Sequence, residues 1–131
     1  MQDFKEKILI IEDSPTQRAI LSNLVTELGL EPVVVTSFDS IIVETIQSQS
    51  INTVLLDLIL VDDDGTPIGD GFQICSDIKN HNPDIKVIVI SAESDESAKL
   101  FALSQGADGF ICKPFEINEL EKSLNELSVS N

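Results

Sequence analysis

Short apolar runs alternate with segments of helical periodicity along the whole chain, and this alternation strongly limits the possible folds. Residues 7–11, with the sequence KILII, form a β-branched run that is typical of a strand buried on both faces. Comparable runs occupy residues 32–36, 53–56, 86–90 and 109–112. Between and after these runs, apolar residues recur three and four positions apart, which predicts helices.

The helical segments have recognisable ends. Ser14-Pro15 supplies an N-cap and a first-turn proline for a helix that Gly29 closes. The other helices are predicted at residues 38–47, around 72–78, at 95–105 and from 116 to about 127. Five strands alternating with five helices predict an α/β fold, in which a parallel sheet carries helices on both faces.

The length and net charge of the chain limit its possible domain organisation and functions. The chain has 131 residues, and we expect one domain over residues 1–131 with its core at about 7–127. Its 23 acidic and 8 basic residues give a formal net charge of −15, which argues against direct binding to nucleic acid or to an anionic membrane surface. Hydrophobic residues make up 42% of the chain, so it can bury a core, unlike an acidic disordered chain.

Several features favour a cytoplasmic location. The N-terminal segment MQDFKEK has no apolar stretch of the kind found in secretory signals. No apolar run approaches the roughly 18 residues that a membrane span needs. Cys75 and Cys112 lie far apart in apolar patterns, which predicts two buried, reduced thiols rather than a disulfide.

Polar residues follow the predicted strands at the edge where such sheets bind ligands. These residues are Glu12 and Asp13 after the first strand, Asp57 after the third, Ser91 and Ala92 after the fourth, and Lys113 after the fifth. In the flavodoxin-like strand order 2-1-3-4-5, the first and third strands are neighbours, so the three carboxylates should lie close together. Mg²⁺ would neutralise them, and the lysine and serine side chains are suited to binding phosphate oxygens.

The residues at the strand ends together resemble one family. The groups Glu12-Asp13, Asp57, Ser91-Ala92 and Lys113-Pro114 are similar in order and spacing to those of the receiver domain of two-component response regulators. The resemblance covers essentially the whole chain. It implies a signalling domain and not an enzyme, since such a domain catalyses only its own phosphorylation and dephosphorylation.

The resemblance implies a phosphoacceptor and a metal site. Asp57 would accept a phosphoryl group from a histidine kinase or a phosphotransfer protein, with Mg²⁺ or Mn²⁺ as the cofactor. The metal would bind directly to the carboxylates of Asp13 and Asp57, and through water to Glu12. The backbone carbonyl of Ile59 would be a further ligand.

Other residues would hold the phosphoryl oxygens and transmit the signal. Ser91, Lys113 and the backbone N–H of Ala92 would bind the phosphoryl oxygens, and Lys113-Pro114 would be a cis peptide. Phe110 matches the aromatic switch position, so its ring would turn inward as Ser91 moves toward the phosphoryl group. A plain core position for Phe110 is an equally good interpretation of this residue.

The implied output surface is formed by the predicted helix 95–105, strand 109–112 and helix 116–127. It would bind a downstream protein effector or an output domain absent from this chain, and it allows a homodimer. No output domain is expected within these residues. The chain is therefore either a stand-alone receiver or part of a longer protein.

The segment after Asp57 departs from the family pattern. Val61 stands where the family usually has proline. Asp64-Gly65 lies at the usual spacing, yet Asp70-Gly71, six residues further on, better precedes the apolar pattern of the third helix. We therefore expect an inserted polar loop over Val61–Asp70, which leaves the geometry around the Ile59 carbonyl open.

Alternative functions remain in other classes. A degenerate receiver would act only as an interaction module, and the inserted loop is compatible with that role. A phosphatase of the haloacid-dehalogenase type would need a second aspartate two positions after Asp57, where Ile59 stands. A calcium loop around Gly65 lacks two necessary carboxylates, because Leu60 and Gly71 would occupy its first and last positions.

Overall fold

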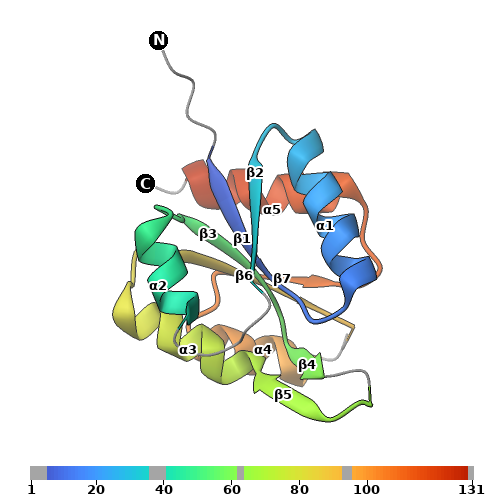
Figure 1. Ribbon diagram of the computed structural model, residues 1–131, viewed down its shortest axis with the longest axis vertical. Coiled ribbons are helices and arrows are strands. Elements are labelled where there is room, and N and C mark those ends of the chain that lie inside the picture. The colour runs from blue at the N-terminus through green and yellow to red at the C-terminus, as the bar shows by residue number, and fades with distance from the viewer. Residues whose placement is uncertain (1–5, 36–40, 62–63, 93–95, 130–131) are drawn as a thin grey trace.

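Five parallel strands form the centre of the molecule (Figure 1). The computed structural model describes residues 6–35, 41–61, 64–92 and 96–129. The strands of this sheet are β1 (Lys7–Ile11), β2 (Glu31–Val35), β3 (Thr53–Asp57), β6 (Lys86–Ser91) and β7 (Gly109–Cys112). Their order is β2-β1-β3-β6-β7, which confirms the predicted flavodoxin-like order 2-1-3-4-5.

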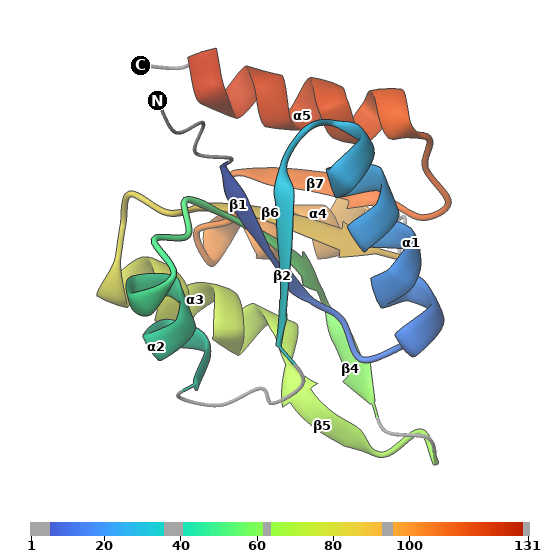
Figure 2. The same cartoon turned by 45° about the horizontal axis from the view of Figure 1, so that its top comes forward.

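Helices cover both faces of the sheet (Figure 2). They are α1 (Pro15–Glu27), α2 (Ile41–Ser48), α3 (Gly71–His81), α4 (Glu96–Ser104) and α5 (Ile117–Val129). One core cluster joins α2, α3 and α4 to one face, through side chains such as Ile46, Ile78 and Ala102. The other joins α1 and α5 to the opposite face, through Val25 and Leu120. The structure therefore has three layers, as predicted.

The central strands explain the continuous apolar runs of the sequence. Every residue of β3 is buried, and in β1 and β6 only the first residue is not fully buried. Successive side chains of such a strand point to opposite faces, and both faces are covered, so the positions between the strand ends are apolar. The edge strands β2 and β7 are more exposed. The edge of the core is marked by Glu12 directly after β1, by Asp57 at the end of β3 and by Ser91 at the end of β6.

Element boundaries differ from the predictions by a few residues. β2 begins at Glu31, and α5 extends from Ile117 to Val129. The predicted starts of the second and fourth helices include Phe38 and Asp95, which lie outside the described residues. Across the residues that the structure describes, no helix is long and apolar enough to cross a membrane.

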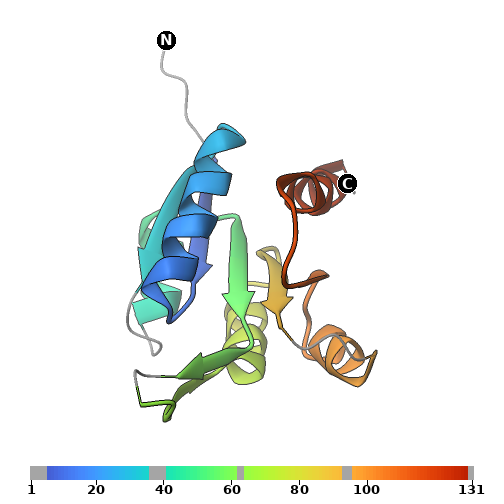
Figure 3. The ribbon, with the colours of Figure 1, turned by 90° about the vertical axis from the view of Figure 1, so that its right-hand side faces the viewer.

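The segment after Asp57 contains two short strands that pair as a β-hairpin. The prediction of a polar loop was wrong for the residues of these strands. Strands β4 (Ile59–Val61) and β5 (Pro67–Asp70) pair antiparallel, with an irregularity between Leu60 and Val61. The hairpin projects from the end of β3 beyond the sheet (Figure 3). Leu60 is buried in the core, which anchors the hairpin. A three-residue strand is too short to show a period in the sequence.

The start of the third helix is confirmed at Asp70-Gly71. The Asp70 Oδ1 atom accepts hydrogen bonds from the backbone N–H groups of Phe72 (3.0 Å) and Gln73 (3.4 Å). This is the geometry of an N-cap, in which an aspartate oxygen satisfies helix N–H groups that have no partner within the helix.

The prediction of two buried thiols needs correction for Cys112. Cys75 is buried, and burial raises the pKa of its thiol to about 11, whereas Cys112 on the edge strand β7 is only half-buried. Both thiols are free, as predicted. His81 is the exposed last residue of α3, which has its C-cap at Asn82.

Candidate functional site

Three carboxylates meet at the carboxyl ends of β1 and β3. Glu12 and Asp13 directly follow β1, and Asp57 is the last residue of β3. The register pairs Ile11 with Leu56, so the two strands end side by side. One carboxylate oxygen from each of the three residues lies within 4.8 Å of the others. The predicted acidic cluster is therefore formed, and its oxygens are close enough to share one cation.

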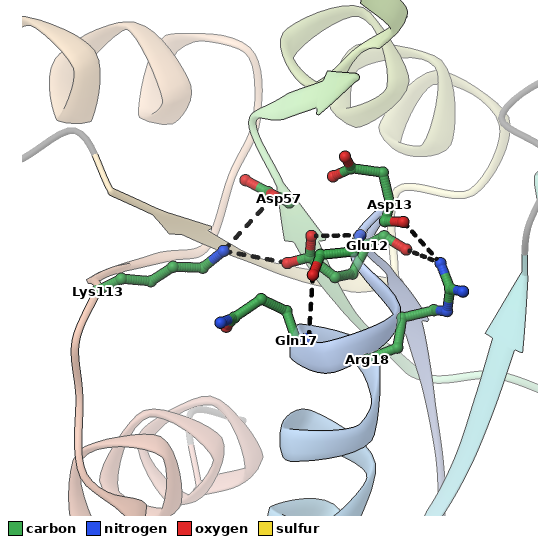
Figure 4. A network of polar contacts seen from close by, with 7 residues as sticks. Glu12, Asp13, Gln17, Arg18, Asp57 and Lys113 are labelled. Atoms are coloured by element: carbon green, nitrogen blue, oxygen red, sulfur yellow. Dashed lines mark hydrogen bonds and ion pairs between the residues drawn. The ribbon is translucent and has the colours of Figure 1, made fainter. Parts of the chain in front are cut away.

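Lys113 directly follows the carboxyl end of β7, and its side chain reaches this cluster (Figure 4). Its Nζ atom lies 3.1 Å from Glu12 Oε2 and 3.5 Å from Asp57 Oδ2. The Lys113-Pro114 peptide is cis, as predicted. The Lys113 backbone N–H donates to the Ser91 carbonyl at 2.8 Å, which ties the end of β7 to the end of β6.

Burial and a neighbouring like charge make Glu12 a weaker acid than an ordinary glutamate. Glu12 is 1% exposed and Asp57 is 9% exposed. Burial, and secondarily the neighbouring Asp57 carboxylate, raise the pKa of Glu12 to about 7, although Lys113 acts in the opposite direction. One lysine therefore does not fully compensate the acidic pair, and a bound divalent cation would supply the missing positive charge.

The site fits a divalent cation on chemical grounds. Mg²⁺ takes oxygen ligands, and carboxylates that converge on one point are a donor set of the right kind. Three carboxylates against one ammonium leave an excess of negative charge in a largely buried place. This excess is the observation from the structure that favours a cation, because carboxylates so placed repel one another without one.

The raised pKa of Glu12 predicts a pH-dependent stability. Between the ordinary glutamate pKa of 4.5 and about 7, Glu12 keeps its proton in the folded chain and loses it in the unfolded chain. Its contribution to the free energy of unfolding is therefore fully present at low pH and is lost as the pH rises toward about 7. Glu12→Gln should therefore increase the free energy of unfolding by about 1–3 kcal/mol at about pH 8 and by much less at about pH 5.

Urea unfolding at both pH values, in the presence of a chelator, measures this effect. Glu44→Gln on the exposed side of α2 removes the same charge away from the site and is the matched control. A stability difference between Glu12→Gln and wild type that is the same at both pH values would contradict the assignment.

The remaining predicted residues lie next to the cluster. Ser91 is the buried last residue of β6, one position past Ile90, which pairs with Asp57. Ala92 follows it and is exposed. Phe110 on β7 is partly buried and packs against the core cluster beneath α2, α3 and α4, a placement that fits both interpretations of this residue. Ile59 begins β4, two residues after Asp57.

Arg18 is a further residue of the site that is not among the predicted ones. It lies in the first turns of α1, and its Nη1 atom donates to the backbone carbonyls of both Glu12 and Asp13. Its position five residues after Asp13 was a usable signal, because side chains near a helix N-terminus lean back toward the preceding segment.

Comparison with known proteins assigns the family. The family model of the response regulator receiver domain matches residues 8–125. The chain is 33% identical over 128 residues to the probable transcriptional regulator ycf27 of Cyanophora paradoxa, covering 97% of this chain and 50% of that protein. It is 38% identical over 118 residues to the transcriptional regulatory protein KdpE of Staphylococcus aureus, covering 88% and 47%. The chain thus spans about half the length of these curated relatives.

Solved structures agree on the fold. The CheX-CheY-BeF3-Mg+2 complex from Borrelia burgdorferi contains a chain that matches with a TM-score of 0.83 at 24% identity, covering 95% of this chain and 90% of that one. A two-component response regulator from Clostridium difficile matches with a TM-score of 0.81 at 23% identity, covering 96% and 98%. Together with the family match over most of its length, these findings show that the chain belongs to the receiver domain family of two-component response regulators.

Proposed function

We propose that the chain accepts a phosphoryl group on Asp57 from a phosphohistidine of a histidine kinase or phosphotransfer protein. The observation that carries this proposal is the convergence of Glu12, Asp13 and Asp57 within 4.8 Å, with Lys113 Nζ at 3.5 Å from Asp57. A carboxylate nucleophile, an adjacent cation site and a lysine are the groups that phosphoryl transfer to a carboxylate needs.

A divalent cation would be held by the carboxylates of Asp13 and Asp57 directly and by Glu12 through water. Mg²⁺, or Mn²⁺ in its place, would neutralise charge on the phosphoryl oxygens and on the acidic cluster. Among the described residues, Lys113 is the one lysine that forms ion pairs with the cluster, and Glu12 is almost fully buried, which supports a resident cation.

The hairpin register supports the Ile59 carbonyl as a further ligand. Ile59 pairs with Asp70, and the Gly71 N–H donates to the Leu58 carbonyl at 3.2 Å beside that pair. This pattern makes Ile59 and Asp70 a non-hydrogen-bonded pair of the ladder. The backbone N–H and C=O groups of such a pair point away from the partner strand, so the ladder itself does not use the Ile59 carbonyl. The inserted hairpin is therefore compatible with the cation site.

In the proposed transfer, an Asp57 carboxylate oxygen attacks the phosphorus atom and the N–P bond of the phosphohistidine breaks. The electron pair of that bond leaves with the imidazole. Lys113 exchanges part of its contact with Glu12 and Asp57 for a phosphoryl oxygen, while the Ser91 hydroxyl and the Ala92 N–H donate to the others. Ser91 ends the strand that pairs with Asp57 and Ala92 follows it, which supports this assignment.

The proposed output is a population shift on the surface of α4, β7 and α5. Movement of Ser91 toward the phosphoryl group would allow the partly buried Phe110 ring to turn inward, which would change this surface. Leu100 of α4 is exposed by 58%, so this helix already offers an apolar contact. The curated relatives are named as transcriptional regulators, which supports an effector or output domain as the partner, with a homodimer as a further arrangement.

Incubation with acetyl phosphate and Mg²⁺ tests the proposal. We expect a mass increase of one phosphoryl group that is labile to hydroxylamine, as an acyl phosphate is, and that does not form when a chelator is present from the start. A wild-type chain that gains no adduct would refute phosphoacceptance and favour a pure interaction module. Sustained turnover of phosphate esters would instead favour a phosphatase.

A further inference from the structure

We propose that Arg18 is a positioning residue for the divalent-cation site. Its guanidinium would hold the backbone of Glu12 and Asp13 in the conformation that presents both carboxylates to the cation. The inference rests on the proposed function, because it concerns the same cation, and it adds a residue that contacts neither the cation nor the phosphoryl group.

The contacts of Arg18 are directed at the backbone and come from one atom. Nη1 donates to the Glu12 carbonyl at 3.0 Å and to the Asp13 carbonyl at 2.9 Å. These two carbonyls lie between the last residue of β1 and the first residue of α1. Because an arginine side chain stays charged at all ordinary pH values, both hydrogen bonds are charge-assisted. One nitrogen thus fixes two successive peptide groups.

The start of α1 fixes Arg18 itself. The Ser14 Oγ atom accepts from the Gln17 N–H at 3.3 Å, and the Arg18 N–H donates to the Ser14 carbonyl at 2.8 Å. The Ser14 N–H in turn donates to Glu12 Oε1 at 3.2 Å. The arginine side chain is half-buried where it returns to the preceding segment. The acidic segment is therefore held from the helix by both backbone and side-chain contacts.

Arg18 and Lys113 have different partners in the site. Lys113 contacts the carboxylate oxygens of Glu12 and Asp57, whereas the Arg18 guanidinium donates to the backbone carbonyl oxygens of Glu12 and Asp13. Figure 4 shows the two cations on opposite sides of the Glu12-Asp13 segment, with the Asp13 carboxylate pointing away from Arg18. Arg18 can thus fix the segment without using the oxygens that a cation needs.

The direction in which cation affinity changes when Arg18 is removed distinguishes a positioning role from a purely electrostatic one. If Arg18 acted only as a nearby positive charge, its removal would make the site more negative and would tighten the binding of a divalent cation. If Arg18 positions the ligands, its removal lets the segment relax and weakens binding. Loss of an outer contact that orients metal ligands typically costs about 10–100-fold in metal affinity.

Mn²⁺ binding to the full chain, followed by the electron paramagnetic resonance signal of the free ion, provides the test. Arg18→Ala is expected to weaken binding by about 10-fold. Lys99→Ala removes an exposed positive charge on α4 and serves as the control, with an expected change of less than about 2-fold. An affinity of Arg18→Ala equal to or tighter than wild type would overturn the inference.

Arg18→Lys keeps the charge and decides the question if the alanine variant fails to fold. A lysine side chain is shorter, so it should not bridge both carbonyls, and weaker Mn²⁺ binding than wild type is expected; unchanged affinity would overturn the inference. In the acetyl phosphate reaction, both variants should need more Mg²⁺ for half-maximal rate and should reach nearly the wild-type rate at saturation. Wild-type protein that binds no Mn²⁺ would refute the cation site, and with it the proposed function, before any variant is compared.

Discussion

Asp57→Asn is expected to abolish phosphoryl transfer to the chain and to make the metal-free fold more stable. The amide is a poor nucleophile and cannot form the acyl phosphate, so no hydroxylamine-labile adduct should appear with acetyl phosphate and Mg²⁺. The same substitution removes the charge that, together with burial, raises the pKa of Glu12 to about 7. The free energy of unfolding should therefore rise by about 1–2 kcal/mol at about pH 8 in the presence of a chelator.

Asp64→Asn is the matched control for this variant. Asp64 is exposed in the connection between β4 and β5, so the substitution changes the same functional group outside the acidic cluster. It should accept the phosphoryl group like wild type and leave stability almost unchanged. An adduct that persists in Asp57→Asn would place the acceptor elsewhere. An unchanged or lower stability would argue against electrostatic repulsion at the cluster.

Gly71→Ala is expected to destabilise the fold by about 2–3 kcal/mol, which corresponds to a fall of about 10 °C in Tm. A β-carbon at this position would lie 2.6 Å from Leu58 Cα, 2.7 Å from the Asp57 carbonyl oxygen and 2.8 Å from the Leu58 carbonyl oxygen. All three are backbone atoms, so no side-chain rotation relieves the overlap. The start of α3 or the end of β3 must move, and the acceptor Asp57 lies at the latter.

Gly109→Ala on β7 is the control for the loss of a glycine. There the new β-carbon would meet only side-chain atoms of Ile88, at 3.6 and 3.8 Å, which are ordinary contacts. Thermal unfolding measures both variants, and the rate of phosphorylation by acetyl phosphate reports on Asp57. Equal stability of Gly71→Ala and Gly109→Ala would show that the close approach of α3 to β3 is not tight.

The sequence predicted the sheet and the acidic cluster because both depend on local patterns. A strand such as β3 is buried at every position, so its apolar run is continuous and its end is marked by Asp57. Glu12, Asp13 and Asp57 then come together from the strand order alone. Connection rules leave few possible strand orders for such a chain, so the strand order and the acidic cluster that depends on it could be predicted.

Other features could not be predicted because they arise from contacts between segments. The hairpin depends on pairing Ile59–Val61 with Pro67–Asp70, and neither strand is long enough to show a period. The ion pair of Lys113 with Glu12 joins residues far apart in the chain, and its geometry follows only from the folded strand ends. The two carbonyl contacts of Arg18 depend on a side-chain conformation that no residue pattern specifies.

The hairpin also provides a place for an optical reporter. A single residue, Leu58, separates the strand that ends at Asp57 from the hairpin strand β4, while Gly65 and Thr66 in the connection are exposed. The chain contains no tryptophan and no tyrosine. A tryptophan placed at Thr66 would therefore be the sole long-wavelength fluorophore of the protein, attached to the segment that directly follows the acceptor. Its emission would allow cation and phosphoryl occupancy to be followed in real time without labelling either cysteine.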